Sequence, residues 1–199
     1  LHLDSPIAEI SGVSGMELRI VKPVLLDIAG MEEPATGTVV SIPDHGEPAV
    51  NRLYLRAGRL PETGREGEIA VNEHFAEAHR MAPGSTFAAV INGRKRVLTV
   101  TGIVLSPEFI FTISPGDIVP DPRRMGILFM PSTQLAGLYD MTGVFNDVAL
   151  RTSRGADLDA VIRQLDTLMK PYGGVGAHDR DDQISHAFLD SELTQLRGM

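Results

Sequence analysis

The sequence predicts an α+β fold with two subdomains, and three observations support this prediction. Short apolar runs alternate with turn residues through the middle of the chain, which is typical of a strand-rich domain. Asn92-Gly93 lies between two apolar runs and predicts a two-residue hairpin turn. Residues 158–169 carry apolar side chains at three- and four-residue spacing, so they form the clearest amphipathic helix.

We expect the two subdomains to be discontinuous along the chain. Residues 1–49 and 140–180 should form a mixed β-α-β subdomain, and residues 50–139 should be inserted into it as a strand-rich subdomain. Residues 181–199 should form a separate helix that leads toward a transmembrane span.

The first part of the chain is expected to begin with helical turns and to continue as two strands. Apolar residues at spacings of four and three mark the turns, namely Leu3, Ile7 and Ile10. Gly12 would end this helix. Residues 16–28 are rich in Val, Leu and Ile and predict a strand that is interrupted near Pro23, because proline is confined to edges and bulges. Residues 38–42 predict a second strand that can pair with the first.

Short strands dominate the predicted insertion. Gly58 to Pro61 predicts a turn, because glycine can adopt a positive φ and proline fixes its own φ. Residues 125–130 are continuously apolar and predict a buried strand, after which Pro131 begins a short helix that ends near Leu138. The other expected elements are strands at residues 53–55, 68–72, 86–91, 94–100 and 97–105 and a helix at 73–80.

The C-terminal part predicts a strand, a helix, a strand and a last helix. Residues 144–151 alternate well enough for a strand, the helix 158–169 follows, and a short strand at 174–177 would complete a β-α-β unit with a right-handed crossover. In the last helix we expect one apolar stripe to face the domain and a second to face the bilayer surface or a second copy of the protein. The second stripe, a candidate coupling helix surface, consists of Leu189, Leu193 and Leu196.

Composition and charge argue against several classes of protein. The net charge of −8 argues against nucleic-acid binding, which relies on clustered Lys and Arg to neutralise phosphates. The absence of cysteine excludes disulfides, a thiolate nucleophile and Cys-ligated metals. The longest uncharged run, residues 125–139, is too short for a bilayer span of about 20 residues. The chain starts without Met and stops within a helical pattern, as would a loop excised between two membrane spans or a trimmed cytoplasmic domain.

No residue pattern predicts a metal, a cofactor or catalysis. His74 and His79 are five residues apart and would lie on different faces of a helix, unlike the ligand pair of a zinc helix. The acidic run that starts at Asp179 is similar to a calcium-binding loop. However, Ile184 stands where the loop requires Gly, and Asp190 stands where Glu is usual. Capping of a helix therefore explains the acidic residues better. Motifs of hydrolases and phosphate-binding loops are absent. A ligand-binding or sensor module stays open, because small-molecule pockets leave little trace in a sequence.

A proline-rich loop at residues 108–124 is the candidate site of partner contact, since loops of this length are usually functional or disordered. Its three adjacent large apolar residues either pack into the core or form an exposed patch for a partner. The prolines of the loop favour the second alternative, because a stiff loop loses less entropy when a partner binds. We predict the exposed patch. The candidate contacts are Phe109, Ile110, Phe111, Arg123 and Arg124.

Several short motifs follow one another from about Ser41 onward. They include Gly58-Arg59-Leu60-Pro61, Glu68-Ile69-Ala70-Val71-Asn72, Val100-Thr101-Gly102-Ile103-Val104, Ser106-Pro107-Glu108-Phe109-Ile110 and Phe145-Asn146-Asp147-Val148. In this order and spacing, the chain resembles the extracytoplasmic domain of FtsX-like and MacB-like ABC transporter permeases.

The resemblance implies a MacB-like periplasmic domain of two subdomains, held outside the cytoplasmic membrane between the first two transmembrane helices of a permease. It implies no enzymatic activity and no cofactor. The implied partners are an ABC ATPase acting through the rest of the permease, a second permease copy, and an accessory protein or a lipoprotein, lipid or peptide substrate. In such a family the domain couples the ATPase cycle to transport or to the regulation of cell-wall enzymes.

Overall fold

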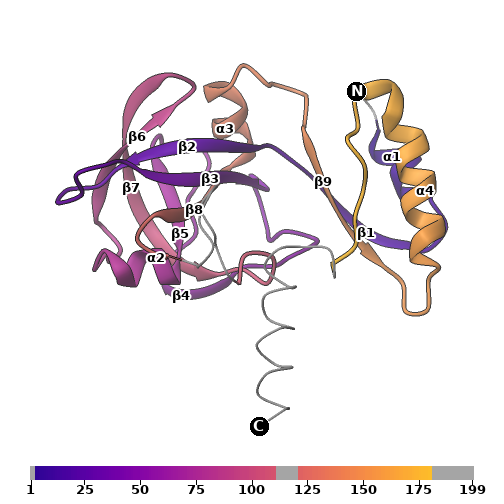
Figure 1. Cartoon of the computed structure of the whole chain (residues 1–199), viewed down its shortest axis with the longest axis horizontal. Coiled ribbons are helices and arrows are strands. Elements are labelled where there is room, and N and C mark those ends of the chain that lie inside the picture. Colours follow the sequence, from indigo (N-terminus) through magenta and orange to yellow (C-terminus); the bar gives the residue numbers. More distant parts are fainter. Residues whose placement is uncertain (1–2, 111–120, 181–199) are drawn as a thin grey trace, which may run out of the picture.

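The structure, a computed structural model, describes residues 3–110 and 121–180. These residues form two units that lie side by side along the long axis of the molecule, a barrel and a smaller two-stranded unit (Figure 1). The strands of the barrel are β2 (Val21–Asp27), β3 (Ala35–Ile42), β4 (Tyr54–Gly58), β5 (Glu68–Asn72), β6 (Thr86–Ile91), β7 (Arg94–Leu105) and β8 (Met125–Pro131).

Six of these strands close into a ring. The hydrogen-bonded order is β4-β7-β5-β8-β3-β2-β6, and β6 also pairs with β7. Closure depends on the length of β7, a strand of 12 residues. Its first half pairs with β6 and its second half with β5 and β4, so β4 alone lies outside the ring. A closed ring removes the free edges that an open sheet would present.

Two short helices, α2 (Glu73–Ala78) and α3 (Ser132–Leu138), cap opposite ends of the barrel (Figure 1). Phe75 and Leu135 anchor them in the barrel core, and both side chains are fully buried. Burial of such side chains contributes about 1.5–3 kcal/mol each, which is the main reason that such short helices hold their places.

The barrel has an internal two-fold pattern. The strands β5 and β8 pair antiparallel, and each leads directly into one of the two capping helices. Two residues after the end of each helix lies a residue with positive φ, Arg80 at 54° and Asp140 at 55°. In both, the next residue is a methionine whose N–H donates to the carbonyl five residues earlier at 2.8 Å. Each strand of the pair also has one parallel neighbour, β7 for β5 and β3 for β8.

The smaller unit consists of an antiparallel pair of strands covered by two helices. Its elements are α1 (Asp4–Ala8), β1 (Val13–Arg19), β9 (Asp147–Thr152), α4 (Leu158–Met169) and a 3-10 turn (Lys170–Tyr172). Ile7 of α1 meets Val161 and Leu165 of α4 in a separate apolar cluster. The predicted helical turns, the strand before α4 and the helix 158–169 are therefore confirmed.

The predicted hairpin is also confirmed. Asn92 and Gly93 both have positive φ, 47° and 72°, as a type I′ turn requires. The pairing of Ile91 with Arg94 places the turn at the expected two residues. The predicted pairing of the second strand of the chain is confirmed as well, because β2 and β3 form an antiparallel pair.

Three expectations were wrong. The boundary at residue 49 does not separate the units, because β2 and β3 belong to the barrel and only β1 pairs with β9. The first strand breaks at Ile20 and continues through Pro23, which is tolerated because the pairing of β2 with β6 starts only at Leu25. No β-α-β unit forms, since residues 174–177 are not a strand, and Ala177 instead donates its N–H to Asp166.

The predicted helix at residues 181–199 lies outside the described residues. Within the described ranges, no helix is long and apolar enough to cross a membrane.

Candidate functional site

The two units meet at a buried arginine. Arg19 ends β1 and is only 8% exposed. Its Nη1 and Nη2 donate to the two carboxylate oxygens of Glu108 at 2.5 and 2.9 Å, and its Nε donates to Asp147 Oδ1 at 2.7 Å. Asn51 donates its Nδ2 hydrogen to Glu108 Oε2 at 2.7 Å. We call these four residues the Arg19 joint.

The charges of the joint stabilise one another. Burial alone would lower the pKa of Arg19, but the hydrogen bonds and charges of Glu108 and Asp147 outweigh it and raise the pKa above its ordinary value. The guanidinium therefore stays charged. Because its planar fork binds Glu108 through two parallel bonds, the pair also fixes an orientation. A cavity of about 10 Å³ beside the joint has room for roughly one water molecule.

The chain crosses from the small unit to the barrel right beside the joint. Ile20, the residue between β1 and β2, donates its N–H to Ser41 Oγ at 2.8 Å and accepts the Ser41 N–H at 2.9 Å. Asn146 binds both backbone groups of Val21 through its side-chain amide, at 2.9 and 2.8 Å. The crossing is therefore held on both sides, by β3 and by the segment before β9.

A second set of contacts joins the small sheet to the linker between β3 and β4. Ala49 donates its N–H to Glu17 Oε2 at 2.8 Å, and its carbonyl accepts from Arg151 Nη1 at 3.3 Å. Glu17 and Arg151 come from β1 and β9, so the linker lies against the face of the sheet that α1 and α4 leave open. These contacts between the units are polar or ionic.

Residues 106–110, which follow β7, pass between the two units. Glu108 binds Arg19, while the ring of Phe109 packs edge-on against Phe129 of β8 with centroids 6.4 Å apart. Phe109 is half-buried and belongs to the apolar cluster on the outer face of β8. This is the packing role that the sequence left open as the alternative for these residues. Ile110 is half-buried, and Phe111 lies outside the described residues.

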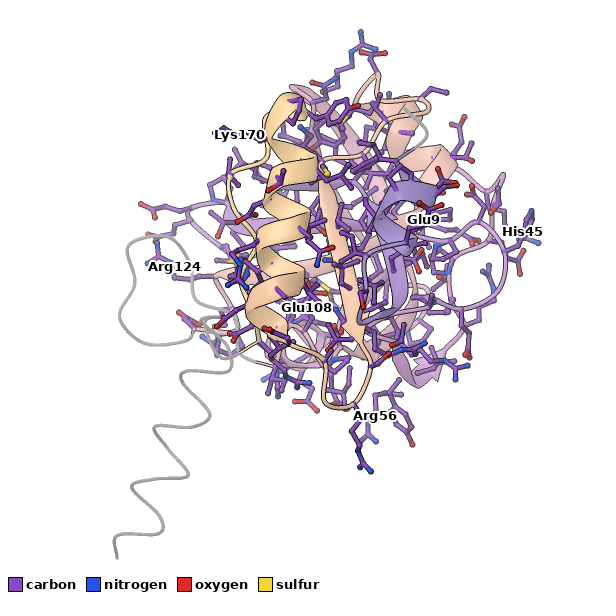
Figure 2. All side chains as sticks on the ribbon, turned by 90° about the vertical axis from the view of Figure 1, so that its right-hand side faces the viewer. Glu9, His45, Arg56, Glu108, Arg124 and Lys170 are labelled. Carbon is purple, nitrogen blue, oxygen red and sulfur yellow. The ribbon has the colours of Figure 1, made fainter. Side chains whose placement is uncertain are left out.

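The other two candidate contacts, Arg123 and Arg124, are exposed. Arg124 projects from the periphery of the molecule (Figure 2) and approaches exposed Glu33 at 3.8 Å. The backbone of the pair is held in place, since the Arg123 carbonyl lies 2.9 Å from His79 Nε2 and the Arg124 carbonyl accepts the Thr36 N–H. Their contact with a partner stays a prediction.

The two histidines near α2 have different surroundings. His79, which follows α2, packs against Phe75 with ring centroids 4.5 Å apart and the rings tilted by 59°, while His74 is exposed. Within residues 3–110 and 121–180, no group of three or more His, Asp and Glu side chains could hold a metal ion.

Sequence reasoning missed the Arg19 joint, because its members come from four separate stretches. The one available signal was an arginine between Leu18 and Ile20 in a run that otherwise predicts a strand. Two partners of Arg19, Glu108 and Asp147, lie within motifs that carry the family resemblance. The structure shows that these two motif residues bind the buried arginine between the units.

Comparison with known proteins identifies solved structures that are similar to this chain. No family model and no curated protein sequence matches the chain. The extracellular domain of the ABC-type transporter YknZ from Gram-positive bacteria matches with a TM-score of 0.52 and 15% identity, over 87% of this chain and 83% of that one. The chain has the fold of this extracellular domain. The predicted α+β fold class is therefore confirmed.

Two further solved structures match at lower scores. The periplasmic region of MacB from Actinobacillus actinomycetemcomitans has a TM-score of 0.46 and 14% identity, over 83% of this chain and 72% of that one. A domain of a putative permease protein from Porphyromonas gingivalis has a TM-score of 0.41 and 12% identity, over 85% and 69%.

Proposed function

We propose that this chain is the extracytoplasmic domain of an ABC transporter permease subunit. The observation that carries the proposal is the YknZ-like fold, which extends over most of both chains. The motif order of the sequence points to the same class, and residues of two of these motifs form the joint between the units.

In this role the domain performs no catalysis. It couples the cycle of an ABC ATPase, through the rest of the permease, to a lipoprotein, lipid, peptide or accessory protein outside the membrane. The exposed arginines Arg123 and Arg124 and the segment around Ile110 are the proposed partner contacts. Leu189, Leu193 and Leu196 remain proposed as the surface of a coupling helix, outside the described residues.

The rival function is a ligand-binding or sensor module, and the cavity beside the Arg19 joint does not favour it. A small-molecule site usually needs a concave pocket of about 300–1,000 Å³. The cavity beside the Arg19 joint has only about 10 Å³ and is lined in part by the charged groups that bind one another.

The test is purification of the full-length protein from membranes in detergent through an affinity tag. We expect an ATPase with a phosphate-binding loop, on the same or a separate chain, to be recovered in a stoichiometric amount together with ATP hydrolysis. Recovery of the tagged protein from the soluble fraction, without any ATPase, would contradict the proposal.

A further inference from the structure

We propose that residues 106–110 act as a strap that locks the small unit onto the barrel through Glu108, so that the two units move as one body. The consequence for transport rests on the proposed function. The lock itself is a property of this chain, and it can be tested without any transporter.

The strap bonds to one unit and packs on the other. Glu108 binds the guanidinium of Arg19, which ends β1 of the small unit. The next side chain, Phe109, packs against Phe129 of the barrel strand β8. The strap itself continues from β7, so its backbone is anchored in the barrel. A bond made by Glu108 is therefore a bond between the units.

The bond is directional as well as strong. Apolar surfaces slide over one another at little cost, whereas a buried guanidinium must keep its hydrogen-bond partners in place. Arg19 is 8% exposed, so a rotation of the units would separate a buried guanidinium from Glu108. Asn51, in the linker between β3 and β4, donates to the same Glu108 oxygen as Arg19 Nη1, so a second residue also orients the carboxylate.

The strap also begins the segment that carries the proposed partner contacts. A partner that engages Ile110 would pull on a backbone only two residues from the carboxylate that holds the small unit. In a permease, this would carry a displacement at the partner site to the small unit without a flexible step between them.

The experiment measures the distance between the units in the full 199-residue chain. The sequence contains no cysteine, so Glu77→Cys in α2 and Asp159→Cys in α4 give two specific spin-label sites at exposed positions, one in each unit. In Figure 1 these helices lie in different units along the long axis. Pulsed electron paramagnetic resonance should give one narrow distribution of the distance between the two spin labels when no further substitution is made.

The decisive variant replaces both charges of the pair, Arg19→Met with Glu108→Leu, because exchanging a buried ion pair for apolar residues often preserves folding. We expect the distribution to broaden at least two-fold or to gain a second maximum. If the double variant does not fold, Glu108→Gln is used, which keeps the size of the side chain and removes its charge. The same broadening is expected.

The matched control is the pair Arg59 and Glu68, which makes a similar two-bond contact at 2.8 and 2.6 Å within the barrel alone. Arg59→Met with Glu68→Leu should leave the distribution narrow. A folded strap variant whose distribution is as narrow as that of the parent would overturn the strap. Loss of transport in the permease with an unchanged distribution would likewise contradict the strap, while leaving the proposed function intact.

Discussion

Asp44 shows how one carboxylate organises the barrel from a linker. It accepts hydrogen bonds from the Thr133 N–H at 3.1 Å, from Thr133 Oγ1 at 2.5 Å and from Ser132 Oγ at 2.9 Å, all at the start of α3. The residue before α3 is Pro131, whose side chain makes no capping hydrogen bond. Asp44 therefore caps α3 from a distant part of the sequence.

The first prediction follows from this cap. Burial alone would raise the pKa of Asp44, but the hydrogen bonds from Thr133, Ser132 and Thr63 outweigh it and lower the pKa below its ordinary value. A lowered folded-state pKa means that the stabilisation is present above the unfolded-state value of about 3.9 and is lost as the pH falls through the folded value. Asp44→Ala should cost about 1 kcal/mol in the free energy of unfolding at pH 7.

Urea denaturation at pH 7 and pH 3 measures this cost. The difference between parent and Asp44→Ala should shrink at pH 3, whereas Glu66→Ala, at an exposed residue, should show almost no difference at either pH. An Asp44→Ala cost that stays the same at pH 3 would show that the charge of the cap contributes nothing.

Gly58 is required by a close approach of two strands. Its φ is +73°, and a Cβ at this position would lie 2.1 Å from the carbonyl oxygen of Thr101. Gly64 has a similar φ of +84° but has no atom within 4 Å of the same position. A comparison of alanine at the two positions therefore distinguishes the cost of a positive φ from the cost of a steric clash.

The second prediction compares alanine at these two positions. Gly64→Ala should lose about 1 kcal/mol, the cost of a positive φ for an L residue. Gly58→Ala should lose at least about 2 kcal/mol more, because the backbone of β4 or β7 must move. Thermal or urea unfolding of both variants measures the difference, and equal losses would exclude the steric explanation.

At the scale of elements, the segment after β7 is held by packing as well as by charge. Phe109 is half-buried against Phe129, so its truncation removes apolar contact from the outer cluster of the barrel. The third prediction is that Phe109→Ser loses about 1–3 kcal/mol of folding stability, less than the cost of truncating a fully buried Phe.

The control for Phe109 is Val97→Ser, since Val97 is 69% exposed on β7 and should change stability by less than about 0.5 kcal/mol. A Phe109→Ser variant as stable as the parent would contradict the packing role of Phe109. It would instead favour the exposed partner contact that the sequence predicts.

Local signals in the sequence predicted most of the elements but not how they assemble. The Asn92-Gly93 turn and the spacing of apolar residues in α4 depend on neighbouring residues, so both could be predicted. The placement of β2 and β3 in the barrel depends on pairing with β6 and β8, which are distant in the chain. Arg19 and Glu108 are also far apart in sequence, and no local pattern indicates that they meet.

At the scale of the whole molecule, a polar joint holds two units together in a fold known from an ABC transporter extracellular domain. The proposed function places the chain outside the cytoplasmic membrane as part of a permease. The two units and the joint between them matter for transport only if this location is correct.

The most direct test is the labelling of a single cysteine in the full-length protein in intact spheroplasts. Glu77→Cys places a thiol at an exposed position of α2, and a membrane-impermeant maleimide reports which side of the membrane it occupies. A protein without the added cysteine gives the background. If the domain lies outside the membrane, labelling before lysis will equal labelling after lysis, and labelling that occurs only after lysis would contradict the proposed location.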